Sequence, residues 1–180
     1  MFRVRLALCA LAGILVAGCE PGTFYADLKG ETTVSGNPLP VDPILSAFAP
    51  FGAFTNVDFD ANQDFQNAGV TKDQVGSVMV SFFLLKITSP STQDFSFLDS
   101  ISFYAKAGDT EALIAGKTGI ASMNLHAPNP ELILDLESVE LQPFITAPAM
   151  SIVVRGSGRV PPSDTALQAN VKLKVGVKLL

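Results

Sequence analysis

The last part of the chain alternates strictly between apolar and polar residues, and this pattern constrains the fold more than any other. Apolar side chains from Leu167 to Leu179 occupy every second position, and Lys172, Lys174 and Lys178 lie between them. Successive side chains of a β-strand point to opposite faces, so a period of two predicts a long strand with one face on a core and one in water.

Earlier segments predict further strands. Residues 77–88 are apolar at nearly every position, which indicates a strand covered on both faces. Residues 100–107 alternate cleanly, and the turns after them predict a meander of short antiparallel strands over residues 100–125. Residues 24–35, with Gly30 in the middle, predict a strand with a bulge or bend. Leu132, Leu134 and Leu136 are expected on one face of another strand.

These segments favour an all-β fold. Roughly seven to nine short strands with proline and glycine turns predict an antiparallel, immunoglobulin-like β-sandwich. A closed β-barrel is the alternative, because strand number alone does not separate the two.

One or two short helices are expected within residues 43–70. Asp60 is a candidate cap for a helix over residues 61–68, with Gln63 as its capping-box partner and Gly69 as the helix end. Thr71 is a candidate cap for a further turn.

Residues 44–54 carry no charge and contain Phe48, Phe51 and Phe54. They form either a lid over the core, which a strand covered on both faces would need, or a surface for an envelope partner or lipid. The lid is the favoured interpretation.

Residues 1–19 have the layout of a secretory signal. Arg3 and Arg5 precede the apolar run Leu6–Ala17, which is shorter than the ~20 residues that a membrane-spanning helix needs. The run ends in Val16-Ala17-Gly18-Cys19. This motif resembles the lipobox of bacterial lipoproteins, in which an aliphatic residue and two small residues precede a cysteine. The remaining chain resembles immunoglobulin-like β-sandwich lipoproteins.

The resemblance implies cleavage between Gly18 and Cys19, lipidation of the Cys19 thiol and acylation of the new amino terminus. Residue 20 is glutamate, and because aspartate at this position commonly retains lipoproteins in the inner membrane, the resemblance favours the outer membrane. Residues 19–23 then form a lipidated tether of at most ~14 Å before a single domain at residues 24–180. Ordinary secretion, with Cys19 as a chance thiol, is the alternative.

Charge and composition exclude several function classes. Loss of residues 1–18 removes Arg3 and Arg5 and leaves ten cationic against 17 acidic side chains, a net charge of −7. Nucleic-acid binding needs clustered cations and is therefore not expected. The chain has one histidine, and Cys9 would leave with the signal, so no disulfide is expected. No catalytic residues and no cofactor are predicted.

The acidic segment 58–64 has a weak resemblance to a calcium-binding loop. Asp58, Asp60, Asn62 and Asp64 place oxygen ligands at alternate positions, and calcium takes six to eight oxygens. Gln63 stands where the EF-hand pattern has its turn glycine, and Gly69 where it has its bidentate glutamate. A strand end followed by a helix cap is the favoured interpretation.

Other candidate residues have ordinary explanations. His126 is expected in a surface loop, Lys117 in a hairpin turn rather than a phosphate loop, and Glu137 and Glu140 as solvated acids rather than a glycosidase pair. The lysines of the last strand either contact anionic headgroups or protect an edge strand from pairing.

The sequence therefore predicts a lipid-anchored protein of the bacterial cell envelope, on the periplasmic side of the outer membrane. The lipidated Cys19 would attach the protein to the membrane. The role would be non-catalytic binding or structural support, with an envelope protein or lipid as partner. The alternative is a carrier or chaperone of a lipid or other apolar ligand, with a cavity between sheet and cover.

Overall fold

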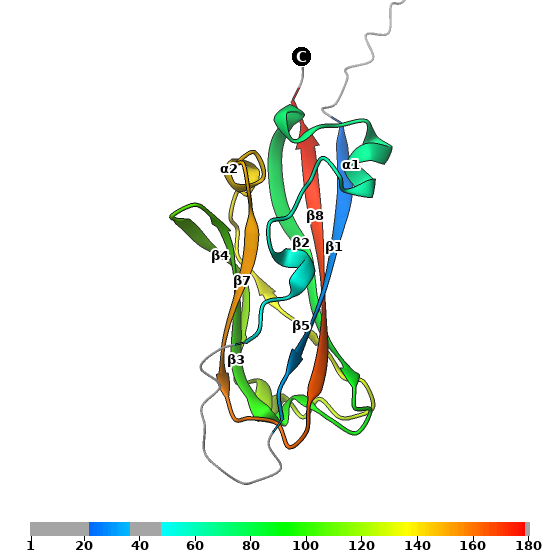
Figure 1. Cartoon of the computed structure of the whole chain (residues 1–180), viewed down its shortest axis with the longest axis vertical. Helices are drawn as coiled ribbons and strands as arrows, with labels where there is room; N and C mark the ends of the chain where they lie inside the picture. The colour runs from blue at the N-terminus through cyan, green and yellow to red at the C-terminus, as the bar shows by residue number, and fades with distance from the viewer. Residues whose placement is uncertain (1–21, 37–47, 179–180) are drawn as a thin grey trace, which may run out of the picture.

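The computed structural model describes residues 22–36 and 48–178, and antiparallel strands make up most of it (Figure 1). The strands are β1 (Thr23–Val34), β2 (Val75–Ser89), β3 (Leu98–Ala107), β4 (Thr110–Thr118), β5 (Glu131–Ile133), β6 (Asp135–Leu136), β7 (Ser151–Gly158) and β8 (Thr165–Val177). The helices are η1 (Gly52–Phe54), α1 (Gln63–Ala68), η2 (Lys72–Gln74), η3 (Phe95–Phe97), η4 (Ile120–Met123) and α2 (Gln142–Ile145). The predicted signal, residues 44–47 and Leu179 lie outside the described residues.

The strands form two separate four-stranded sheets. Sheet A has the order β1-β8-β2-β5 and sheet B the order β6-β4-β3-β7, and all pairings are antiparallel. A continuous cluster of buried apolar side chains includes residues from both sheets. The predicted antiparallel β-sandwich is confirmed, and the barrel alternative is wrong because the described strands belong to two sheets.

The order of the strands resembles that of a jelly roll. In immunoglobulin domains the first strand lies beside the second, whereas here β1 lies beside the last strand, β8. After β1 in sheet A, the chain reaches sheet B at Val57, which forms a β-bridge with Met150, the residue before β7. The chain then returns to sheet A as β2. With this bridge included, and apart from the β3–β4 hairpin and the step from β6 to β7, which stay in sheet B, the chain crosses from one sheet to the other between successive strands, as in jelly rolls.

The predicted alternation of β8 is confirmed. Its apolar residues from Leu167 to Val175 are buried, while Lys172 and Lys174 are exposed on the other face. However, β8 pairs with β1 on one side and with β2 on the other. The interpretation of its lysines as protection of an edge strand is therefore wrong.

Strand β2 contains a bulge that changes which residues face the core. Its register with β8 shifts between Val80 and Phe82, so Val78 and Val80 share the buried face with the odd-numbered residues Phe83, Leu85 and Ile87. Sequence periodicity assumed one unbroken register and assigned these residues to two faces. The prediction of a strand covered on both faces is wrong, because the opposite face of β2 is half-buried or exposed.

The segment 48–54 closes the open side of the sandwich between two edge strands, β1 and β7 (Figure 1). Phe48, Phe51 and Phe54 are buried, which confirms the lid interpretation for the described part of the segment. A Cβ atom on Gly30 of β1 would lie 3.0 Å from Phe51 Cβ and 3.0 Å from Phe54 Cε1. Gly30 thus makes room for two rings, and because β1 pairs with β8 in continuous register, the bulge predicted there is wrong.

We expect Gly30→Val to destabilise the domain. Valine would suit a strand, but its side chain would overlap the lid rings, and overpacking of a core typically costs about 1–3 kcal/mol. The measurement is the free energy of urea unfolding, followed by far-UV circular dichroism. Thr33→Val, at an exposed position of the same strand, is the control and should change little. Equal stability of the two variants would contradict this role of Gly30.

Local boundaries differ from the sequence predictions around α1. Asn62, and not Asp60, is the N-cap, since its side chain accepts hydrogen bonds from the backbone N–H groups of Asp64 and Phe65. Gly69 ends the helix with φ of 65°, as predicted. Thr71 precedes η2, and its backbone N–H donates to the Gln74 side chain over 2.9 Å, which confirms the predicted further turn.

The meander over residues 100–125 is confirmed only in part. β3 and β4 form the expected hairpin, but β4 continues to Thr118, so Lys117 lies in a strand and not in a turn. Residues 120–123 form a 3-10 helix and not a strand.

Residues 131–136 cross between the two sheets. β5 pairs with β2 in sheet A, and β6 pairs with β4 in sheet B. The prediction that Leu132, Leu134 and Leu136 share one strand face is wrong, because the chain changes sheets between them. Leu132 and Leu134 are buried, whereas Leu136 is exposed.

Candidate functional site

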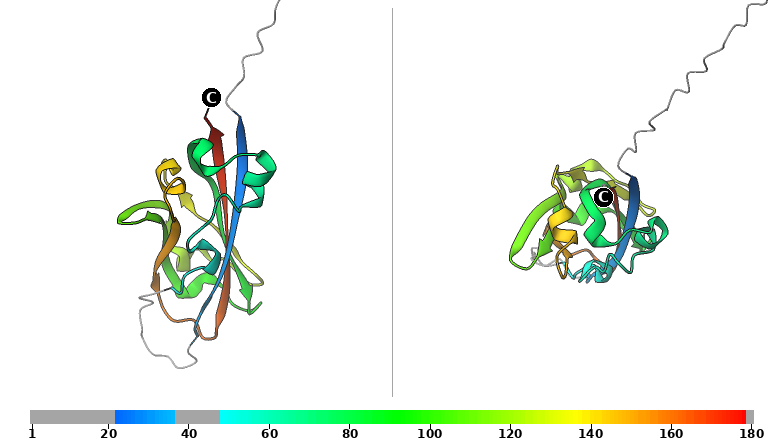
Figure 2. Two further views of the ribbon diagram at one scale, coloured as in Figure 1. Left: turned by 45° about the horizontal axis from the view of Figure 1, so that its top comes forward. Right: turned by 90° about the horizontal axis from the view of Figure 1, so that it is seen from above.

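The predicted lipid-attachment residue Cys19 and its neighbour Gly18 lie outside the described residues. The structure does describe where the chain enters the domain. β1 begins at Thr23, and the Val177 backbone N–H donates to the Gly22 carbonyl over 2.9 Å. The start of β1 and the end of β8 therefore share one end of the sandwich, seen from above in Figure 2. We call this the anchor end.

Two helical segments close the anchor end around β1 and β8. Phe65 of α1 packs edge-on against Phe24 of β1, with ring centroids 5.1 Å apart. The Lys178 backbone N–H donates to the Gln74 carbonyl over 2.8 Å, and Lys178 Nζ donates to the Asp73 carbonyl over 3.0 Å. These contacts fix the start of β1, where the predicted tether would join the domain.

The acidic segment 58–64 uses its side chains to fix backbone groups. Asp58 Oδ1 accepts from the Asp60 N–H, Asp60 Oδ1 accepts from the Lys72 N–H, and Asp64 Oδ2 accepts from the Asp27 N–H. Asn62 caps α1. Asp27 lies on the edge strand β1, so the Asp64 bond also satisfies an otherwise free edge group.

This arrangement favours the capping interpretation over the calcium loop. In the part of the chain that the structure describes, no three histidine, cysteine, aspartate or glutamate side chains gather in a way that could hold a metal ion. The sequence identified the correct polar residues but not the directions in which their oxygens point.

Other candidate residues also have structural roles. Glu140 Oε1 accepts hydrogen bonds from the backbone N–H groups of Val78 and Gln142, at 2.6 and 2.9 Å, and so ties the start of α2 to β2. Lys117 Nζ pairs with Asp135 Oδ1 at 2.7 Å, across β4 and β6. His126 is exposed in the loop before β5. Lys117 therefore lies in a strand and not in a phosphate loop, and Glu140 holds backbone groups in place.

Two charged groups have displaced pKa values, and both displacements come from local pairing. The Ser96 side chain, and then its backbone N–H, stabilise the Asp94 carboxylate and lower its pKa. The hydrogen bond to Glu111, followed by contact with Tyr104, raises the pKa of Arg155. Arg155 of β7 lies 4.3 Å from the centre of the Tyr104 ring on β3, so these groups tie the outer face of sheet B together.

An apolar groove of about 560 Å³ lies between the β3–β4 turn and α2. Its lining is almost free of polar side chains and consists of Ala107, Gly108, Thr110, Pro143, Phe144, Ala147, Pro148 and Ala149. The sequence did not predict this groove, because its two walls are far apart in the chain. The expected cavity between sheet and cover is instead occupied by the lid phenylalanines.

No helix among the described residues is long and apolar enough to cross a bilayer. No family model matches the chain, and no curated protein does.

Three similar solved structures come from viruses. The decameric BFDV capsid protein is 7% identical, with a TM-score of 0.45, over 89% of this chain and 100% of that one. Mud crab tombus-like virus gives 11% identity and a TM-score of 0.29, over 100% and 94% of the two chains. Cocksfoot mottle virus gives 11% and 0.28, over 100% and 98%. All three TM-scores are low, and the functional argument therefore rests on this chain's own residues.

Proposed function

We propose that this chain is a lipid-anchored protein of the bacterial cell envelope, with a non-catalytic binding or structural role. One observation carries the proposal: the motif Val16-Ala17-Gly18-Cys19 ends an apolar signal-like run just before β1 begins at Thr23. A lipidated cysteine in this place would leave a short tether and then the folded sandwich. Glu20 favours delivery to the outer membrane, facing the periplasm.

The chemistry of the domain supports a non-catalytic role. Four of the candidate acids, Asp58, Asp60, Asp64 and Glu140, accept hydrogen bonds from backbone N–H groups, which stabilises the fold. Catalysis by a nucleophile needs that group beside a base and a third orienting group. The single histidine of the chain, His126, is exposed in the loop before β5.

A carrier of an apolar ligand is the second candidate function, and the groove beside α2 favours it. Small-molecule sites are mostly apolar clefts of roughly 300–1,000 Å³, and the groove has a volume of about 560 Å³. A lipid acyl chain has the chemistry to fit such a lining.

We expect the mature amino terminus to be Cys19 with lipid attached. Trypsin should release residues 19–29 as one peptide, since Lys29 is the first cationic residue after Cys19. Its mass should exceed that of the bare peptide by a thioether-linked diacylglycerol and an amide-linked acyl group. A peptide with a free thiol, or one that starts elsewhere, would refute the proposal. Organic extraction of the same protein separates the two candidates, because a carrier should release lipid that is not covalently bound.

A further inference from the structure

The outer face of sheet A differs in charge from the rest of the protein. Between its middle and the anchor end, Lys29, Lys172 and Lys174 are exposed around Asp27. Asp27 lies 3.8 Å from Lys172, and within the described residues Lys29 and Lys174 have no ion-pair partner. This half of the face is therefore cationic, on a chain with a net charge of −5.

The half of this face farther from the anchor end is neutralised by pairing. Lys86 Nζ contacts Glu131 Oε1 at 2.8 Å, and Gln168 Nε2 donates to Glu31 Oε1 over 2.9 Å. The unpaired lysines are thus confined to the part of the sheet that the tether enters.

Large apolar side chains lie exposed on the same face of sheet A. Tyr25, Phe82 and Ile133 are 55%, 38% and 61% exposed. Phe82 lies opposite Lys172 in the register, and Tyr25 lies opposite Lys174. The bulge in β2 turns Phe82 outward, so the fold itself exposes this ring. Aromatic rings and lysines side by side are typical of surfaces that lie at the boundary between membrane and water.

The length of the tether selects this face over the outer face of sheet B. Cys19 and Thr23 are four residue steps apart, which span at most ~14 Å. Thr23 begins β1, the edge strand of sheet A. Because stacked sheets lie ~10 Å apart and outer side chains add to that distance, the outer face of sheet B is at or beyond the reach of this tether.

We propose that the outer face of sheet A docks on the anionic phospholipid surface of the bilayer that holds Cys19. The inference rests on the proposed lipid anchor. The lysines contact phosphate groups, and Tyr25 and Phe82 enter the headgroup region. The sandwich then lies along the membrane, with sheet B on the side away from the bilayer, and does not stand on its anchor end.

Two single-cysteine labels test this orientation in the lipidated full chain. Ile133→Cys places an environment-sensitive fluorophore on the outer face of sheet A, and Lys106→Cys places it on sheet B near the β3–β4 turn. The only other cysteine of the mature chain is Cys19, whose sulfur carries the diacylglycerol in the proposed anchor. The protein is reconstituted in vesicles of phosphatidylethanolamine and phosphatidylglycerol that contain a lipid-borne quencher.

Docking predicts a blue-shifted, quenched label at residue 133 and an unaffected label at residue 106. The double variant Lys172→Glu/Lys174→Glu should abolish the quenching at residue 133, as should vesicles of phosphatidylcholine alone, while its circular dichroism spectrum stays unchanged. Quenching at residue 106 and not at residue 133 would show that the domain stands on its anchor end. Quenching at neither residue would show that the domain is held away from the bilayer surface. Either result overturns the docking.

The mass of the 19–29 peptide, measured before reconstitution, separates the two proposals. A lipidated peptide with neither label quenched refutes the docking alone. An unmodified peptide refutes the lipid anchor and, with it, the docking that rests on it.

Discussion

Replacing Cys19 by serine should abolish palmitate incorporation and remove the mature protein from the outer-membrane fraction. Serine has almost the same size as cysteine, so the change removes the sulfur that would carry the diacylglycerol and little else. A single acyl chain binds a bilayer only marginally, at ~10⁴ M⁻¹, whereas two or more chains anchor a protein stably. Loss of all chains should therefore change the distribution completely and not by degrees.

The chain contains its own control for this experiment. Cys9 lies inside the apolar run Leu6–Ala17 and would be removed with the signal, so Cys9→Ser should leave labelling and localisation unchanged. A second variant joins residues 20–180 to a signal that ordinary signal peptidase removes, and it should be recovered in the soluble periplasmic fraction. If the Cys19→Ser variant or the fusion of residues 20–180 were recovered in the outer-membrane fraction, a lipid anchor would not be the basis of localisation.

The sequence predicted those parts of the fold in which periodicity is unbroken. β8 is the clearest case, because its period of two holds from Leu167 to Val175 and one face is buried throughout. β3 is a second case, since Ile101, Phe103 and Ala105 are buried and the residues between them are not. In both, the pattern of side chains along one segment determines the answer without knowledge of its neighbours.

The incorrect predictions concern features that depend on which strands lie next to one another. Whether the lysines of β8 lie at an edge depends on which strands flank β8, and the period of its residues does not contain that information. The bulge at Ser81 and Phe82 reverses the faces of β2, and no residue in the apolar run indicates it. The lid was predicted correctly but for the wrong reason, since it closes the side between β1 and β7 and not the outer face of β2.

The candidate sites show the same division. The polar residues of the segment 58–64 were found because their spacing is unusual, but their hydrogen-bond partners Asp27 and Lys72 lie elsewhere in the chain. The cationic and aromatic face of sheet A combines residues from β1, β2 and β8. A sequence pattern identifies the lysines of one strand, whereas only the strand order brings Tyr25 and Phe82 beside them.

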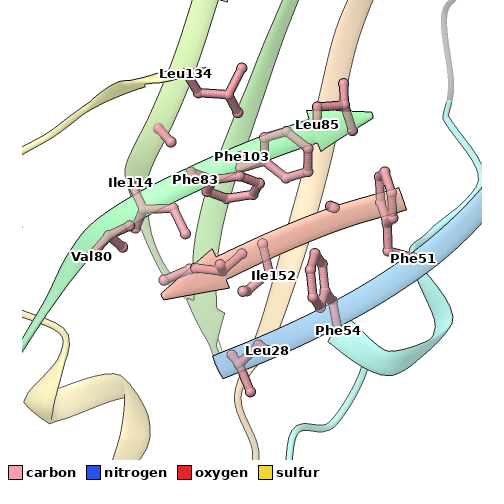
Figure 3. Close-up of a cluster of buried hydrophobic side chains, with 14 of the residues drawn as sticks. Leu28, Phe51, Phe54, Val80, Phe83, Leu85, Phe103, Ile114, Leu134 and Ile152 are labelled. Atoms are coloured by element: carbon pink, nitrogen blue, oxygen red, sulfur yellow. The ribbon is translucent and has the colours of Figure 1, made fainter. Parts of the chain in front are cut away.

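Replacing Phe103 by alanine should destabilise the domain more than any other single change that we predict. Phe103 on β3 is fully buried, with its ring centroid 4.3 Å from that of Phe83 on β2 and 5.7 Å from that of Phe51 in the lid (Figure 3). It therefore joins sheet B to sheet A and to the segment that closes their open side. Truncation of a buried phenylalanine to alanine typically costs about 3–5 kcal/mol, because a cavity remains where the ring was.

A loss of this size is a large part of the ~5–15 kcal/mol that stabilises a typical domain. The chain has no tryptophan, so urea unfolding is best followed by far-UV circular dichroism at about 218 nm, where β-sheets have a negative band. Phe82→Ala is the matched control: Phe82 precedes buried Phe83 but is 38% exposed, and its truncation should cost well under half as much. Phe82→Ala should also weaken the proposed membrane docking, although it removes little stability. The two results would separate core packing by Phe83 from membrane contact by Phe82. If Phe103→Ala lost no more stability than Phe82→Ala, the core would not depend on contact between the two sheets and the lid at this ring.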